Sequence, residues 1–191
     1  MNLAPLLAAG LLAAASVQRP DAPRADLAPP AAATPAAVPA RPAVGALAPD
    51  FLYESKEYLW QSLHNMLEQG DVLLVFAPGD DVLLALERDR ETLLRAGIVP
   101  VAVVGRHESD VWHAVTRLDL GYSLLSDPRN AIAEQFGALD PATRAPAPAW
   151  FVVDRARRVR ASGTALAGVH DWTALAARAL GRSDVHTAGA R

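Results

Sequence analysis

Short apolar runs alternate with helical patterns from residue 71 to residue 180, and this alternation restricts the fold more than any other feature of the sequence. Asp71–Phe76 and Ile98–Val104 are nearly continuous apolar runs, which is typical of strands buried on both faces of a sheet. Helical patterns separate these runs, and a chain that alternates in this way packs helices against a sheet. The sequence therefore predicts an α/β domain.

Capping and turn residues place the other elements of this domain. Asp80 or Asp81 is expected to N-cap a helix that Gly97 closes, and Pro100 must lie near the start of its strand. Three more strands are predicted, the last two as a hairpin whose turn carries the basic run Arg155–Arg160: Tyr122–Leu125, Trp150–Val153 and Arg158–Ala161. Three more helices are predicted, from Ser109 or Asp110 to Leu118, from Asp127-Pro128 onward, and over Asp171–Leu180.

The N-terminus differs in composition from this domain. Residues 1–17 contain an apolar run, Leu3–Val17, that is shorter than the roughly 20 residues needed to cross a bilayer. Small residues end the run, which is typical of a secretory signal peptide cleaved after Ala15. No Lys or Arg precedes the run, so an Ala-rich leader or a misplaced start codon is the alternative. We expect export to the periplasm or the medium, or retention at the inner membrane by an uncleaved signal.

Residues 18–44 hold seven prolines and ten alanines, a composition that cannot build a core. We interpret this segment as a disordered, semi-rigid linker, either a tether that holds the domain away from a membrane or a weakly constrained leader. The folded domain is expected over residues 45–181. Residues 182–191 are small and polar, and we expect a frayed tail.

Charge and cysteine content exclude several classes of function. The chain has 18 Lys and Arg against 21 Asp and Glu, a net charge of −3, so no basic surface favours a nucleic-acid partner. Cysteine is absent, which excludes disulfides, thiolate metal sites and thiol catalysis.

The histidines do not predict a metal site. His107, Asp110 and His113 lie at i, i+3 and i+6 of a predicted helix, a spacing poorer for metal ligands than i, i+4, and we expect a solvated helix face. The other histidines are expected at the margin of an amphipathic stretch, at a helix start and in the tail: His64, His170 and His186. We expect neither a metal nor a cofactor.

Five segments resemble motifs of the peroxiredoxins, the AhpC/TSA or redoxin-like proteins, and they occur in the same order as in that family. The segments are Val44–Phe51, Ser62–Leu63 with Gly70–Phe76, Gly97–Val104, Leu124–Gly137, and Pro148–Asp154. The resemblance covers nearly all of residues 45–181. It implies a thioredoxin-like fold, a three-layer sandwich in which helices flank a mixed β-sheet.

The family's chemistry requires a thiolate at the start of the helix that follows the central strand, where the helix N-terminus stabilises the anion. The family's cysteine positions fall on Val82 and Ala85, and a thioredoxin-type C-x-x-C would fall on Asp81 and Leu84. Arg144 is the nearest candidate for the family's catalytic arginine. The resemblance therefore implies a family member without catalytic residues and without thiol peroxidase activity.

The leading hypothesis is a non-catalytic binding module with a remodelled cleft. An apolar floor and an acidic rim would suit a neutral-to-basic protein segment docking near Pro78–Ala85 and Ala147–Trp150. The resemblance places Pro148, beside Trp150, at the family's cis-proline loop. The cleft candidates are Pro78, Asp80, Asp81, Val82, Ala85, Pro148 and Trp150. The alternatives are a metal-dependent enzyme at Asp80/Asp81 and a degenerate redox relic. A homodimer and a membrane tether through the N-terminus stay open.

Overall fold

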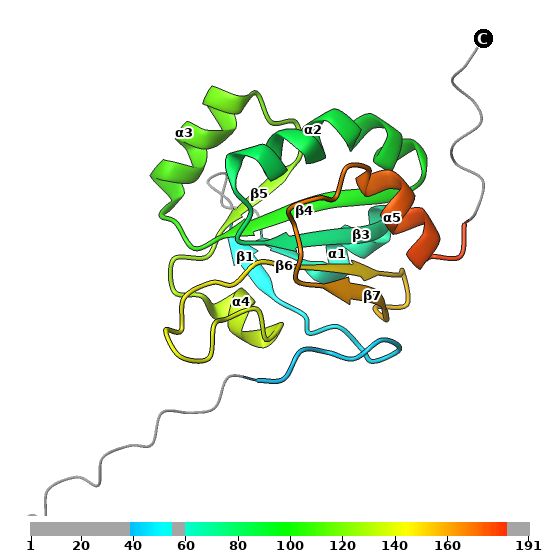
Figure 1. Cartoon of the computed structure of the whole chain (residues 1–191), viewed down its shortest axis with the longest axis horizontal. Helices are drawn as coiled ribbons and strands as arrows, with labels where there is room; N and C mark the ends of the chain where they lie inside the picture. The colour runs from blue at the N-terminus through cyan, green and yellow to red at the C-terminus, as the bar shows by residue number, and fades with distance from the viewer. Residues whose placement is uncertain (1–38, 55–59, 183–191) are drawn as a thin grey trace, which may run out of the picture. The chain divides into compact units, whose positions relative to one another are not determined.

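Seven strands and five helices make up the part of the chain that the computed structural model describes, residues 39–54 and 60–182 (Figure 1). The strands are β1 (Leu52–Glu54), β2 (Trp60–Ser62), β3 (Asp71–Phe76), β4 (Ile98–Val104), β5 (Ser123–Ser126), β6 (Ala149–Val153) and β7 (Val159–Gly163). The helices are α1 (Leu63–Gln69), α2 (Asp80–Arg95), α3 (Glu108–Leu118), α4 (Ala131–Gln135) and α5 (Trp172–Ala179).

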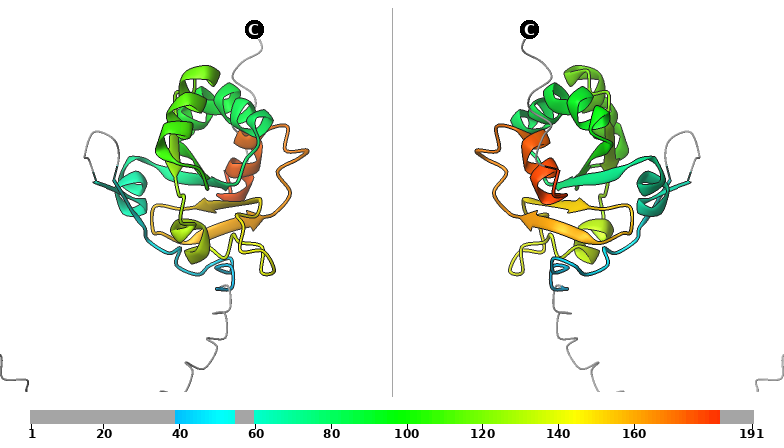
Figure 2. Two further views of the ribbon diagram at one scale, coloured as in Figure 1. Left: turned by 90° about the vertical axis from the view of Figure 1, so that its left-hand side faces the viewer. Right: turned by 90° about the vertical axis from the view of Figure 1, so that its right-hand side faces the viewer.

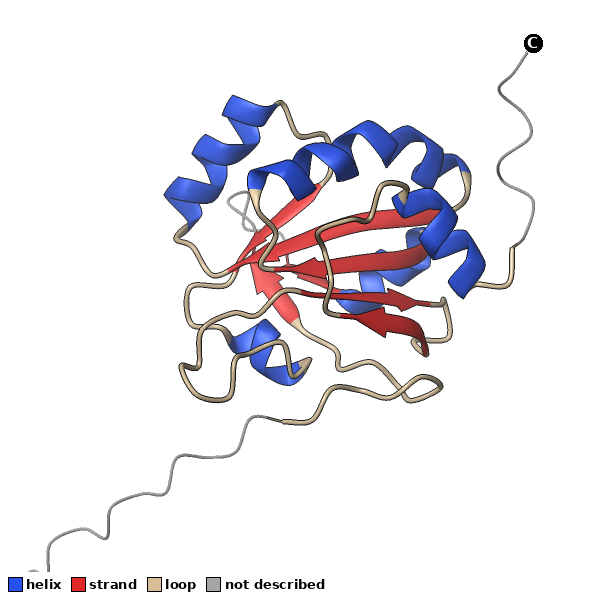
Figure 3. Cartoon of the chain, in the orientation of Figure 1, coloured by secondary structure: helices blue, strands red, loops and turns tan. Residues whose placement is uncertain are grey.

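Five of the strands form one mixed sheet in the order β5-β4-β3-β6-β7 (Figure 3). β3 pairs in parallel with β4 and antiparallel with β6, so it lies at the centre of the sheet. All six residues of β3 are buried, which explains its unbroken apolar run. β6 and β7 form the predicted hairpin, and the basic run from Arg155 lies in its turn as expected.

Helices cover both faces of this sheet (Figures 1 and 2). One core cluster joins the sheet to α2, α3 and α5 through residues such as Leu86, Val111 and Trp172. The other cluster joins the opposite face to α1 and α4 through residues such as Met66 and Ile132. The predicted three-layer sandwich with a mixed sheet is therefore confirmed.

Pro100 lies third in β4, at a point where its missing N–H costs little. The carbonyls of Gly97 and Val103 accept hydrogen bonds from the β3 side, and backbone groups alternate along a strand, so Pro100 faces β5. Pairing with β5 begins only at Val101. The expectation that Pro100 sits near the strand start is confirmed.

Gly97 also closes α2 as predicted. It follows the C-cap residue Ala96 and has a φ of +73°, a left-handed conformation that glycine adopts without strain. The helix therefore ends where the next strand begins.

Several predicted boundaries were wrong. β5 begins at Ser123 rather than Tyr122, and α3 begins at Glu108, with His107 rather than Ser109 or Asp110 as N-cap. The helix expected from Asp127-Pro128 begins only at Ala131. The reason is that Asn130 takes a left-handed backbone, while the Asp127 carboxylate reaches across the turn to cap the helix.

The described fold also begins before the predicted boundary at Val44. Arg41 Nε donates to the Gly137 carbonyl oxygen at 3.2 Å, so the last part of the predicted linker contacts the domain. The predicted signal segment, most of the linker and the tail after Arg182, including His186, lie outside the described residues. In the described residues, no helix has both the length and the apolar composition to span a membrane.

Candidate functional site

The start of α2 is the position where the resemblance places a reactive group. β3 ends at Phe76, and the next residues, Ala77 with a φ of +48° and the buried Pro78, turn the chain into the helix. Gly79 is the N-cap, and its carbonyl accepts from the amide of Val82 at 3.1 Å. The prediction that an aspartate caps this helix was therefore wrong by one residue.

Asp80 and Asp81 occupy the first helical turn instead of the cap. Both carboxylates lie at the positive end of the helix dipole, which stabilises each by about 0.3–1 kcal/mol. Asp80 Oδ2 pairs with Arg117 Nη2 of α3 at 2.7 Å. One of the two carboxylates predicted to form the acidic rim therefore already has a cation beside it. Asp81 is exposed, and its carboxylate folds back over Gly79. Both carboxylates therefore face solvent, and Asp80 is the one that Arg117 pairs with.

Val82 and Ala85 stand at the family's cysteine positions and face inward. Val82 is 6% exposed and packs in the apolar cluster that contains Leu166 and Trp172. Ala85 is half-buried at the edge of the same cluster. Neither side chain carries an ionisable or nucleophilic atom, so these two positions cannot supply the thiolate anion that peroxide reduction requires.

A small hollow of about 190 Å³ lies beside these two positions. On one side it is lined by Asp81, Val82, Ala85 and Arg88 of α2, and on the other by Trp172 and the connection from β7 to α5, which we call the 166–170 segment (Leu166–His170). Arg88 Nη2 donates to the His170 carbonyl oxygen at 2.7 Å, and the Trp172 amide donates to Asp89 Oδ2 at 2.9 Å. Contacts from α2 therefore hold this segment against the helix.

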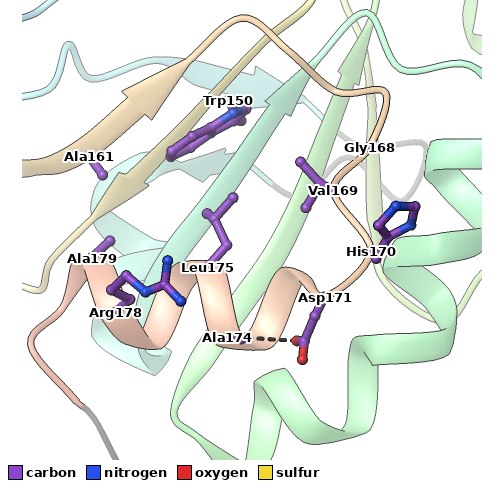
Figure 4. A pocket seen from close by; sticks show the side chains of 10 residues that line it. All are labelled: Trp150, Ala161, Gly168, Val169, His170, Asp171, Ala174, Leu175, Arg178 and Ala179. Atoms are coloured by element: carbon purple, nitrogen blue, oxygen red, sulfur yellow. Dashed lines mark hydrogen bonds between the residues drawn. The ribbon is translucent and has the colours of Figure 1, made fainter.

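Trp150 and Pro148 do not line this small hollow. Trp150 pairs with Val75 in the sheet, and its indole lies against Gly163 of β7, where an added Cβ would stand 2.7 Å from the ring. The ring lines a second, larger hollow of about 540 Å³ (Figure 4). The two hollows share Gly168 and its neighbours, so the 166–170 segment divides what the sequence predicts as one cleft.

Pro148 and Pro78 are lining residues of neither hollow. Pro148 is exposed, just before β6, and Pro78 is buried in the turn into α2. All peptide bonds between described residues are trans, so the resemblance of Pro148 to a cis-proline does not hold. Of the seven cleft candidates, Asp81, Val82 and Ala85 line the small hollow together, and Trp150 lines the larger one.

Arg144 does not replace the family's arginine at this site. Its guanidinium pairs with Glu134 of α4 at 2.6 Å, and α4 covers the sheet face opposite to α2. Tyr122 contacts the first turns of α2, and its hydroxyl donates to the Leu83 carbonyl oxygen at 3.0 Å. Burial raises the pKa of Tyr122 far above its usual range, so the phenol stays neutral and supplies no base.

The described residues contain no group of three His, Asp or Glu side chains close enough to hold a metal ion. His107 caps α3 with its backbone only, and His64 is exposed with its Nε2 3.6 Å from Glu68. The metal-site alternatives at Asp80/Asp81 and at the His107, Asp110 and His113 trio therefore have no geometry to support them in this part of the chain.

Sequence reasoning missed the residues that shape the larger hollow. His170, Leu175 and Arg178 line it together with Trp150, and Figure 4 shows them arranged around one concave surface of α5 and the sheet. The sequence places Trp172, Leu175 and Ala179 on one face of the helix predicted over Asp171–Leu180. Leu175 and Ala179 line the larger hollow and Trp172 lines the small one, so the amphipathic pattern was the available signal.

Comparisons with known proteins agree with the fold described above. The model of the AhpC/TSA family matches residues 44–162, more than half of the chain. A crystal structure of the peroxidoxin BcpB from Mycobacterium tuberculosis is similar at 19% identity and a TM-score of 0.64, covering 78% of this chain and 100% of that one. No curated protein matches.

Two further solved structures share the fold. Thioredoxin peroxidase I of Plasmodium yoelii is 18% identical, with a TM-score of 0.59, and the match covers 78% of this chain and 99% of that chain. The reduced 2-Cys peroxiredoxin of Plasmodium vivax is 18% identical, with a TM-score of 0.53, and the match covers 64% of this chain and 85% of that chain. With the family match over residues 44–162, the chain belongs to the AhpC/TSA family of peroxiredoxins, and it does so without a cysteine.

Proposed function

We propose that this chain is an exported, non-catalytic binding module built on the peroxiredoxin fold. The observation that carries the proposal is the state of the family's cysteine positions. Val82 is buried against Leu166 and Trp172, and Ala85 lies at the margin of the same cluster. Apolar side chains at these positions, beside a hollow, support binding of a partner's side chain rather than reduction of a peroxide.

The ligand we propose is a neutral-to-basic protein segment that docks at the start of α2. The small hollow offers apolar contact through Val82 and Ala85, and Asp81 supplies an exposed negative charge at its rim. Because Arg117 already pairs with Asp80, Asp81 contributes more of the attraction for a basic group. The segment would extend over Ala147–Trp150, where β6 begins beside the end of β3.

Replacing both aspartates with lysine should abolish selection of such segments. On a displayed peptide library, the purified full chain should enrich neutral-to-basic peptides with apolar residues, and the Asp80→Lys/Asp81→Lys variant should lose that enrichment. The fold should persist, with a loss of about 1 kcal/mol because the lysines oppose the helix dipole and one exposed ion pair disappears. Thermal unfolding checks this.

The matched control is Glu68→Lys with Glu91→Lys, which changes the net charge by the same amount at two exposed sites away from the hollow. A Trp150→Ala variant tests whether docking extends to β6. If the Asp80→Lys/Asp81→Lys variant and the Trp150→Ala variant both enrich these peptides as strongly as the unaltered chain does, the partner binds another face and the proposed site is refuted.

Export rests on the N-terminal sequence. The apolar run Leu3–Val17 with small residues at its end favours translocation, and the Pro/Ala-rich residues that follow would separate the domain from the membrane. A fusion of residues 1–44 to a reporter that is active only outside the cytoplasm should give signal. A fusion without residues 1–17 is its control. N-terminal sequencing distinguishes cleavage after Ala15 from retention as an anchor, and a silent fusion would refute export.

A further inference from the structure

The larger hollow beside Trp150 has the composition of a small-molecule site. Its volume of about 540 Å³ lies in the range of known ligand pockets. The indole of Trp150 forms one wall, Val169, Leu175, Ala174 and other small apolar side chains form most of the rest, and His170, Asp171 and Arg178 complete the lining (Figure 4). The surface is therefore apolar with one aromatic plane, which suits a flat hydrocarbon body.

Two charged side chains of opposite sign line this hollow, Arg178 and Asp171. Arg178 is exposed in the last turn of α5, and its guanidinium makes no hydrogen bond or ion pair within residues 39–54 and 60–182. The carboxylate in the lining, Asp171, accepts the Ala174 amide at 2.7 Å as the cap of α5. Arg88 lies close enough to Asp171 to interact with its charge. Because Arg88 itself pairs with Asp89 at 2.9 Å, Asp171 is engaged mainly as the helix cap, while Arg178 is available to an anion.

We propose that this hollow binds a small aromatic carboxylate, with its ring system stacked on Trp150 and its carboxylate paired with Arg178. The guanidinium fork matches a carboxylate in geometry and charge. Gly163 is what allows the stacking, because any side chain there would occupy the space in which the Trp150 indole lies. The proposal goes beyond protein-segment binding at α2, since it depends on Arg178 and the larger hollow and not on Asp81 or Val82, and Trp150 is the residue common to both proposals.

The test uses 1-naphthaleneacetate as the probe, followed by NMR of the ¹⁵N-labelled full chain. The chain has four tryptophans, and the indole N–H signal of Trp150 is assigned with a Trp150→Phe variant. Addition of the probe should shift that signal in a saturable manner. The neutral isostere 1-naphthaleneacetamide should bind about tenfold more weakly, because it lacks the charge that Arg178 pairs with.

Two variants test the assigned contacts. Arg178→Gln should weaken naphthaleneacetate binding about tenfold while leaving the amide unaffected, and Ala161→Leu, which fills the hollow from β7, should weaken both probes. The control Arg129→Gln removes an equally exposed arginine that does not line the hollow, and it should bind as the unaltered chain does. Thermal unfolding verifies that each variant is folded.

The result that overturns the proposal is either no shift of the Trp150 indole at millimolar probe or equal affinity for the acid and the amide. The Asp80→Lys/Asp81→Lys variant separates this outcome from the proposed peptide site. It should retain naphthaleneacetate binding, and loss of binding in that variant would also contradict two independent sites. If naphthaleneacetate does not bind but the chain still selects peptides, this inference is refuted and the proposed function is not.

Discussion

Replacing Phe136 with alanine should lower the free energy of unfolding by about 3–5 kcal/mol. Phe136 is completely buried at the end of α4. Its ring lies 5.2 Å from that of Phe151, 5.3 Å from that of Phe76 and 6.4 Å from that of Phe51, measured between centroids. Truncation would remove the centre of an aromatic cluster that joins β3, β6 and α4.

Urea unfolding followed by linear extrapolation measures this loss. Phe136→Leu is the matched control, because it keeps an apolar side chain of nearly the same volume and should cost only about 1 kcal/mol. A loss below about 1 kcal/mol for Phe136→Ala would mean that α4 does not pack on the sheet as described.

Replacing Asp127 with alanine should cost about 2–3 kcal/mol. The Asp127 side chain is buried, and its two oxygens accept the amides of Ala131, Ile132 and Ala133 at 2.7, 3.0 and 2.9 Å. Alanine would leave these amides without their acceptor, two of them in buried positions. Asp127→Asn keeps one acceptor oxygen and should lose about half as much, and equal stability of both variants with the unaltered chain would contradict the capping role.

The same carboxyl predicts a dependence of stability on pH. Burial raises the pKa of Asp127 above its usual value of 3.8, although the three amides oppose that shift. A raised pKa means that the folded chain holds this proton more tightly than the unfolded chain does. Its contribution is therefore fully present below about pH 3.8 and is lost as the pH rises through the folded-state pKa. The Asp127→Asn deficit should accordingly be larger near pH 4 than at pH 7.

The sequence was sufficient to predict the centre of the sheet because β3 and β4 are long and buried on both faces. The continuous apolar run of β3 and the two strands of the β6–β7 hairpin can be recognised from the pattern of apolar residues in the sequence. β1 and β2 were not predicted, because strands of three residues are too short to show a period. The late start of α4 depends on the backbone of Asn130 and on one side chain, which no periodicity encodes.

At the candidate site, the sequence predicted which residues occupy the family's cysteine positions but not how the surrounding cavity is divided. Val82 and Ala85 could be located because the motif fixes their distance from Phe76. The division into two hollows depends on the 166–170 segment, which is held by Arg88 through the His170 carbonyl. That contact joins residues 82 positions apart in the chain, and spacing within one helix or strand contains no information about it.

We infer that a peroxiredoxin fold persists here without thiol peroxidase chemistry, and hydroperoxide consumption by the purified full chain is the assay for this inference. Hydrogen peroxide and an organic hydroperoxide would each be supplied with dithiothreitol or with thioredoxin and its reductase, beside a cysteine-containing peroxiredoxin as positive control. Because Val82 and Ala85 occupy the cysteine positions, the predicted result is consumption equal to that of a boiled sample. Protein-dependent turnover above the boiled sample, for either hydroperoxide, would contradict the account.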